Sequence, residues 1–238
     1  MALAAAMALL AVACGGSSGG SSTQLAANQT FSFPLIAGDD ISTLDPGQVS
    51  DGVGITLTNE MFGGLLAFAP NLKIVPFAAT SLPTVSADGK TYTFHLKHDV
   101  KFWNGDPVTA QDVLFSWNRA ASLQGSYASA FQPVVGYQAV ANQNVTAMSG
   151  LTAPDDYTVV AHLQYPAGYW LTETAIWTAN ILDPKAVQAG GASWWSNPKT
   201  AVGIGPFQLT QYTPNASVDF QPVKNWWDGS TGSLTHVH

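Results

Sequence analysis

The segment "SADGKTYTFHLKHDVKFWNGDPVTAQDVLFSWNR", residues 86–119, encodes a strand, a tight corner and the start of a helix. Asp88-Gly89 is a turn signal, and apolar residues then alternate with polar ones from Tyr92 to Leu96, as in a half-buried strand. Asn104-Gly105 is a second turn signal, because both residues tolerate positive φ at little cost. The segment therefore predicts a hairpin that passes through a tight corner into a helix.

The helix after this corner has a well-defined start. Pro107 fixes its own φ, and Thr109 is a suitable N-cap with Asp112 three residues later in a near capping box. From Ala110 to Ala121 the apolar residues recur at helical spacing. We expect a capped amphipathic helix that packs one face on the sheet.

The rest of the chain alternates between strand-like, helix-like and turn-rich stretches. A second hairpin is predicted over 148–166, where the turn residues Pro154-Asp155-Asp156 precede an alternating strand from Tyr157 to Leu163. Elsewhere we expect a buried strand at 31–38, a loop at 39–54, a helix at 55–68, a loop at 122–143, a helix at 168–182, a short helix and loop at 183–198, a hairpin at 203–229 and a strand at 234–238.

Composition narrows the class of function. The chain has 238 residues, 46% of them hydrophobic, and a net charge of −7, so it can build a large core but offers no basic patch for nucleic acid. No phosphate loop and no nucleophile–base constellation appears, and Asp39-Asp40 and Asp155-Asp156 are typical of turns. We expect a protein that is not an enzyme and needs no cofactor.

Histidine spacing bears on metal binding. His95 and His98 are three apart in a strand, so their side chains point to opposite faces. His236 and His238 are two apart and share a face, which would allow them to hold a metal. We therefore expect no metal site, with this second pair as a minor alternative.

The first thirty residues are typical of an exported, lipid-anchored protein. Residues 1–13 are apolar but too short to span a bilayer, and Ala11-Val12-Ala13-Cys14 resembles a bacterial lipobox. We therefore expect 1–14 to be a lipoprotein signal with Cys14 as the lipidation site, and 15–30 to be a flexible Gly/Ser tether. Ala11 replaces the commonest leucine and no Lys or Arg precedes the apolar run, so an inert N-terminal helix is the alternative.

Six motifs in order carry a family resemblance. They are "STLDPG", "NEMFGGLLAF", the segment from Ser86 to Arg119, "DDYTVVAHL", "VGIGPFQL" and "NWWDG". Together they resemble the extracytoplasmic solute-binding proteins of the peptide/nickel ABC importers, family 5. The resemblance implies an α+β or α/β fold like that of type II periplasmic binding proteins. Residues 31–238 would then form an N-terminal fragment, the first lobe with an inserted mixed β-sheet subdomain and without the second lobe.

The same resemblance implies a function and a site. A monomer would capture oligopeptides or similar small solutes outside the cell and deliver them to ABC permease subunits. Extended ligands would pair with the backbone of the stretch Ser50-Asp51-Gly52-Val53, and Gly52 would allow close approach. Trp103 would either line the cleft or seat the helix that starts after Thr109.

Other functions remain open at this point. The eight tryptophans include the adjacent pairs Trp194-Trp195 and Trp226-Trp227, which would suit a secreted carbohydrate-binding or carbohydrate-active protein. Within the family, sugar or nickel-chelate binding is the alternative to peptide binding.

Overall fold

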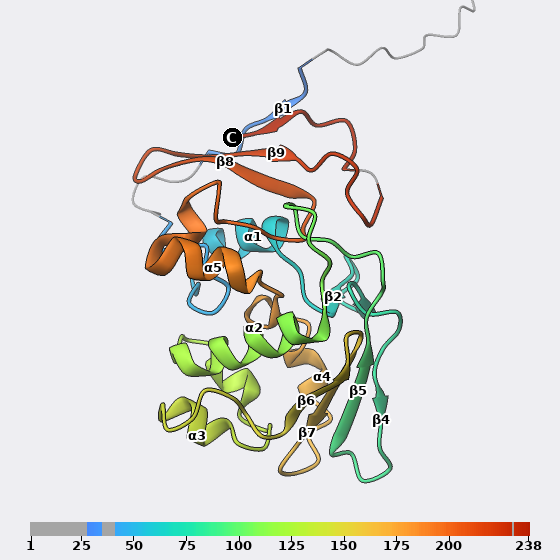
Figure 1. Cartoon of the computed structure of the whole chain (residues 1–238). Helices are drawn as coiled ribbons and strands as arrows, with labels where there is room; N and C mark the ends of the chain where they lie inside the picture. The colour runs from blue at the N-terminus through green and yellow to red at the C-terminus, as the bar shows by residue number, and fades with distance from the viewer. Residues whose placement is uncertain (1–27, 35–40, 230) are drawn as a thin grey trace, which may run out of the picture.

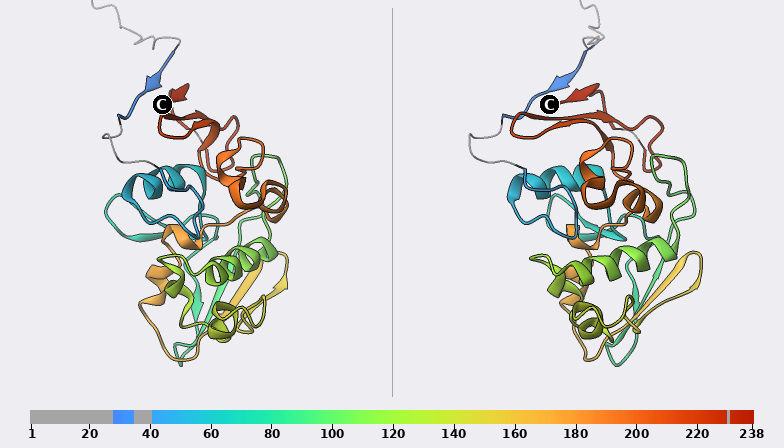
Figure 2. Two further views of the ribbon diagram at one scale, coloured as in Figure 1. Left: turned by 90° about the vertical axis from the view of Figure 1, so that its left-hand side faces the viewer. Right: turned by 60° about the vertical axis from the view of Figure 1, so that its left-hand side comes forward.

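The computed structural model describes residues 28–34, 41–229 and 231–238 (Figure 1). The described chain forms two stacked bodies with a long helix, α2, between them, and the two further views in Figure 2 show the same order. The predicted signal 1–14 with Cys14, most of the tether 15–30 and the pair Asp39-Asp40 lie outside the described residues.

The elements are short and are joined by many turns. The α-helices are α1 (Gly52–Met61), α2 (Ala110–Leu123), α3 (Tyr137–Ala141), α4 (Trp170–Glu173) and α5 (Pro184–Gly190), with 3-10 helices η1 (Ala128–Phe131), η2 (Trp177–Ala179) and η3 (Gly191–Ser196). The strands are β1 (Thr30–Phe31), β2 (Leu66–Phe68), β3 (Ile74–Pro76), β4 (Thr84–Val85), β5 (Thr91–His95), β6 (Leu151–Asp155), β7 (Thr158–His162), β8 (Phe207–Thr213), β9 (Ser217–Pro222) and β10 (His236–Val237). None of the helices in the described ranges has the length and apolarity needed to cross a membrane.

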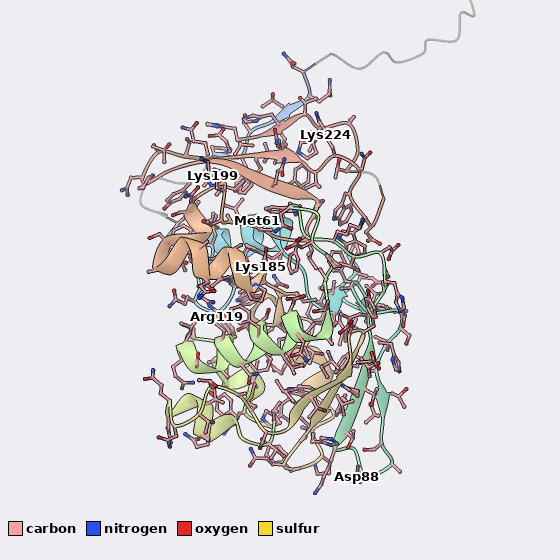
Figure 3. The ribbon with its side chains drawn as sticks, in the orientation of Figure 1. Met61, Asp88, Arg119, Lys185, Lys199 and Lys224 are labelled. Carbon is pink, nitrogen blue, oxygen red and sulfur yellow. The ribbon has the colours of Figure 1, made fainter. Side chains whose placement is uncertain are left out.

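The lower body confirms both predicted hairpins and shows how they combine. Strands β4–β5 and β6–β7 join through β5 and β7 into one antiparallel sheet of order β4-β5-β7-β6, with Phe94 opposite Val159. Asp88 lies in the β4–β5 turn at the far end of this sheet (Figure 3). The hydrogen bond that its carboxylate accepts from Ser86 lowers the pKa of Asp88, and one from the backbone N–H of Lys90 adds to this.

Helix α2 covers the inner face of this sheet. The Asp112 carboxylate accepts a hydrogen bond from the Thr109 backbone N–H at 2.8 Å, which is its half of the predicted capping box, and another from the Thr109 hydroxyl at 2.8 Å. Burial raises the pKa of Asp112, although the Thr109 hydrogen bonds act against it. Trp117 is fully buried and meets Phe94 and Trp170 edge-to-face, so the predicted apolar stripe does face the sheet.

The upper body contains the second four-stranded sheet, of order β1-β10-β9-β8, with α1 and α5 beneath it (Figure 1). The pair β1–β10 is parallel and the other pairs are antiparallel, so this sheet is mixed. A separate buried cluster fills this body, and Phe62, Trp194 and Phe220 are its largest members. Trp103 packs against both this cluster and the one below.

The helix predicted at 55–68 differs from the structure at both ends. Helix α1 begins at Gly52 and ends at Met61, and the residues from Leu66 onward form strand β2. Its start is earlier because Asp51 acts as the N-cap, a signal that the apolar spacing does not contain. Its end is earlier because Gly63-Gly64 disfavours helix and the chain then pairs with β3.

Three other segments also depart from the prediction. The helix expected at 168–182 is reduced to α4 and η2, because the threonines and Ile176 between 172 and 178 favour helix weakly. The loop expected at 122–143 contains η1 and α3, single turns too short to show a period. The strand expected to be buried at 31–38 is β1 in its described part, and Phe31 and Phe33 are 52% and 59% exposed at the sheet edge.

Candidate functional site

The loop that precedes α1 is fixed by a buried ion pair. Asp45 accepts hydrogen bonds from both terminal nitrogens of Arg119, at 2.8 and 2.5 Å, and the two side chains are 2% and 17% exposed. Arg119 extends from α2 into the space between that helix and α5 (Figure 3). Two parallel N–H···O bonds fix orientation as well as distance, so the pair aligns the "STLDPG" loop on α2.

Asp45 also accepts hydrogen bonds from its own loop and from the core of the upper body. Its carboxylate accepts from the Gly47 backbone N–H at 3.0 Å and from Trp194 Nε1 at 3.2 Å, while its carbonyl accepts from Gln48 and Val49. The loop lies so close to Gly125 that a Cβ there would sit 2.2 Å from the Gly47 carbonyl oxygen. The backbone of residues 45–49 is therefore held on several sides.

The candidate ligand segment follows this fixed loop directly. Asp51 caps α1 by accepting from the Gly54 N–H at 2.6 Å, and its second oxygen accepts from the Ser42 hydroxyl at 3.2 Å. Ser50 and Gly52 are exposed, and Val53 is half-buried. The structure corrects one expectation: Gly52 and Val53 lie in the first turn of α1 rather than in an extended loop.

This arrangement leaves backbone donors open to solvent. The first N–H groups of a helix have no partner within the helix. Within the described ranges, the N–H groups of Gly52 and Val53 have no acceptor, whereas those of Gly54 and Ile55 bond to Asp51. A Cβ added at Gly52 would meet no atom within 4 Å, so a ligand backbone has room to approach.

Two aromatic residues that the sequence interpretation missed border this segment. Trp177 donates from Nε1 to the Val49 carbonyl at 3.3 Å, and Tyr127 packs edge-to-face on Trp177 with ring centroids 4.6 Å apart. Tyr127 is 36% exposed. Tyr127 lies in the segment predicted as a loop and Trp177 in the segment predicted as a helix. No local sequence pattern indicates that either residue lies near Ser50. The Tyr127–Trp177 ring pair is therefore attached to the backbone immediately before Ser50.

Trp103 acts at the corner and not beside Ser50. Its backbone N–H donates to the Gly203 carbonyl at 3.1 Å, its Nε1 donates to the Gly205 carbonyl at 2.9 Å, and its ring stacks on Phe62. A Cβ at Gly203 would lie 2.0 Å from the Met61 carbonyl oxygen, so the "VGIGPF" loop must pass close to the end of α1. Trp103 therefore seats the corner against this loop.

Trp103 nevertheless keeps part of its surface open. It lines a cavity of about 180 Å³ together with Trp226, Trp227 and the corner residues Phe102 and Gly105. None of the residues from Ser50 to Val53 lines this cavity. The structure thus brings Ser50, Asp51, Gly52 and Val53 together and places Trp103 at a different position.

The tryptophan pairs are mostly structural. Trp194 is fully buried and therefore offers no face to a sugar. Trp195 packs on Tyr212, and Trp226 and Trp227 both donate from Nε1 to the Ile204 carbonyl at 2.8 Å. The hypothesis that Trp194 forms an exposed sugar platform is wrong for this reason.

Comparison with known proteins places the chain in context. The family model for bacterial extracellular solute-binding proteins, family 5 middle, matches residues 73–238. The periplasmic oligopeptide-binding protein OppA of Haemophilus influenzae is 29% identical over 80% of the chain and 36% of its own length. The dipeptide-binding protein DppE of Bacillus subtilis is 29% identical over 82% of the chain and 36% of its own length.

Solved structures agree with this match. The substrate-binding domain of an oligopeptide ABC transporter from Bacillus anthracis superposes with a TM-score of 0.81 at 31% identity, covering 90% of the chain and 41% of that structure. The chain thus spans about two fifths of the length of these proteins. The similarity confirms the predicted fold class.

The capping role of Asp51 can be tested by stability. Asp51→Ala removes the acceptor of the Gly54 N–H, and we expect the free energy of unfolding to fall by about 1 kcal/mol. Asp51→Asn keeps an oxygen at the same place, and the expected loss is only a few tenths of a kcal/mol. Urea unfolding of both variants measures the difference. Equal losses would show that the carboxylate charge, and not the cap, determines stability here.

Proposed function

Because the chain belongs to the bacterial extracellular solute-binding proteins of family 5, we propose that it captures oligopeptides or similar small solutes outside the cell. It delivers them to the permease of an ABC importer and binds them without changing them. Family members are solute-binding proteins, and the two relatives described above are named for oligopeptides and dipeptides.

The observation that best supports this proposal is a pair of backbone N–H donors without acceptors, held next to a loop that an ion pair fixes in place. The N–H groups of Gly52 and Val53 lack acceptors within the described ranges, and the Asp45–Arg119 pair holds the loop in front of them. A peptide has carbonyl groups at regular spacing that can accept from such donors whatever its side chains are. Backbone recognition of this kind favours binding of peptides as a class rather than binding of one specific peptide sequence.

The neighbouring side chains support the same ligand class. Tyr127 and Trp177 offer aromatic surface, which suits varied apolar peptide side chains. Asp51 lies at the same point and carries negative charge, but both of its oxygens already accept hydrogen bonds. We therefore assign the main contact to the backbone and a secondary electrostatic contribution to Asp51.

The ligand class can be measured directly. Isothermal titration of the protein against peptide, glycan and nickel-chelate libraries should show binding of peptides of mixed sequence. These peptides should remain chemically unchanged after prolonged incubation with the protein. Absence of binding in all three libraries would contradict a solute-binding role. Binding of glycans or chelates alone would replace the peptide assignment with one of the family alternatives.

A matched pair of variants tests the backbone contact itself. Gly52 is the first residue of α1, a position that proline favours, and Asp51 already has the extended conformation that a following proline requires. Gly52→Pro should fold normally, remove one N–H donor and weaken peptide binding by about three- to tenfold. Gly52→Ala keeps the donor, meets no neighbouring atom and serves as the control. Equal affinity of the two variants would exclude this donor from the site.

We also propose that Cys14 is lipidated and that residues 15–30 tether the protein to the outer face of the membrane. The support is the order of the apolar run, the lipobox Ala11–Cys14 and the Gly/Ser stretch. Labelled palmitate should enter the wild-type protein in a bacterial host, and Cys14→Ala should abolish the label and release the protein from the membrane fraction. Labelling that survives Cys14→Ala would overturn this assignment.

A further inference from the structure

Three potential metal ligands converge on the outer face of the upper sheet. They are Asp219 on β9 and His236 and His238 on and just after β10, and their donor atoms all lie within 4.8 Å of one another. We propose that these three side chains hold a divalent transition-metal ion. This site is separate from the segment at the start of α1 and does not depend on the solute-binding proposal.

Strand register explains why the three side chains share a face. Val237 pairs with Phe220 in the antiparallel ladder, and both pack into the upper core. Because side chains alternate along a strand, the neighbours of these two residues point to the opposite face. His236, His238 and Asp219 therefore all project from the face of the sheet opposite Val237 and Phe220, which pack into the cluster that includes Met61 of α1 and Val187 of α5.

The distances fit a small ion with little rearrangement. His236 Nε2 lies 3.0 Å and His238 Nδ1 lies 2.7 Å from the same oxygen of Asp219. Zinc bonds to nitrogen and oxygen near 2 Å, so tetrahedral ligands are about 3.3 Å apart. To reach this spacing the two nitrogen–oxygen distances must lengthen by about 0.3 and 0.6 Å, and the three ligand atoms already lie within 4.8 Å of one another.

Both imidazole nitrogens that face Asp219 must be free of a proton before they can bind an ion. On binding, a ring proton that points at Asp219 moves through solvent to the other ring nitrogen, so each neutral imidazole presents a lone pair.

The donor set indicates the class of metal. Two imidazole nitrogens and one carboxylate oxygen suit zinc, nickel or copper, whereas calcium and magnesium prefer oxygen ligands. The side chains of His236 and His238 are 38% and 53% exposed, which leaves positions for water or a ligand from solvent. The site would be accessible to ions outside the cell.

A bound ion would join the two strands across a long connection. Between Asp219 and His236 the chain passes through Trp226 and Trp227, which dock on the Ile204 carbonyl. An ion that crosslinks the ends of this connection would stabilise the mixed sheet, because it binds only the folded arrangement. Its effect would appear as a metal-dependent rise in melting temperature.

The experiment measures zinc binding to the wild-type protein. Wild-type protein freed of metal should bind one equivalent of Zn²⁺ in isothermal titration and melt at a higher temperature with it, while Mg²⁺ and Ca²⁺ should give neither effect. His236→Gln combined with His238→Gln should weaken Zn²⁺ binding at least about tenfold and abolish the melting shift. Asp219→Asn should weaken binding as well.

The control removes the same number of histidines elsewhere. His95 and His162 lie on the lower sheet and bond to Thr158 and Thr91. His95→Gln combined with His162→Gln should leave Zn²⁺ affinity and the melting shift unchanged, and circular dichroism confirms that each variant is folded. The proposal fails if wild type does not bind zinc, if the His236/His238 variant binds it equally, or if the control variant loses binding to the same extent.

Discussion

The ion pair between Asp45 and Arg119 connects segments 74 residues apart and holds the loop before α1 against α2. Replacing such a pair by apolar residues is often neutral for stability, because desolvation of both charges offsets their attraction. Its role here is to specify position. The pair sets the loop in front of α1, and the loop sets the direction of the open N–H groups at Gly52 and Val53.

A second junction holds the two bodies together. The loop at Gly203–Gly205 accepts hydrogen bonds from Trp103, and Ile204 within it accepts from Trp226 and Trp227. Three of the ordered motifs therefore meet at one short loop beside the end of α1. The first junction supports the ligand segment and the second keeps the upper sheet aligned with helix α2. Together they explain why a chain with many short elements can present a rigid surface.

Local chemistry predicted the elements that are specified within a few residues. The Asp88-Gly89 turn, the cap at Thr109 with Asp112 and both hairpins follow from turn residues, capping and alternation. The join between β5 and β7 could not be predicted, because it depends on contacts between residues far apart in sequence. The same holds for Tyr127 and Trp177, which reach the site only through tertiary packing. The candidate residues from Ser50 to Val53 came from family resemblance, and the cap that organises them came from the structure.

The ligand segment depends on Asp45 and Arg119 forming a desolvated pair that is costly to break. Arg119→Met keeps most of the apolar length of the side chain but leaves Asp45 buried without its charge partner. Urea unfolding should then show a loss of about 3 to 5 kcal/mol, as expected for one partner removed from a buried pair. A loss below about 1 kcal/mol, the value typical of an exposed pair, would contradict the claim.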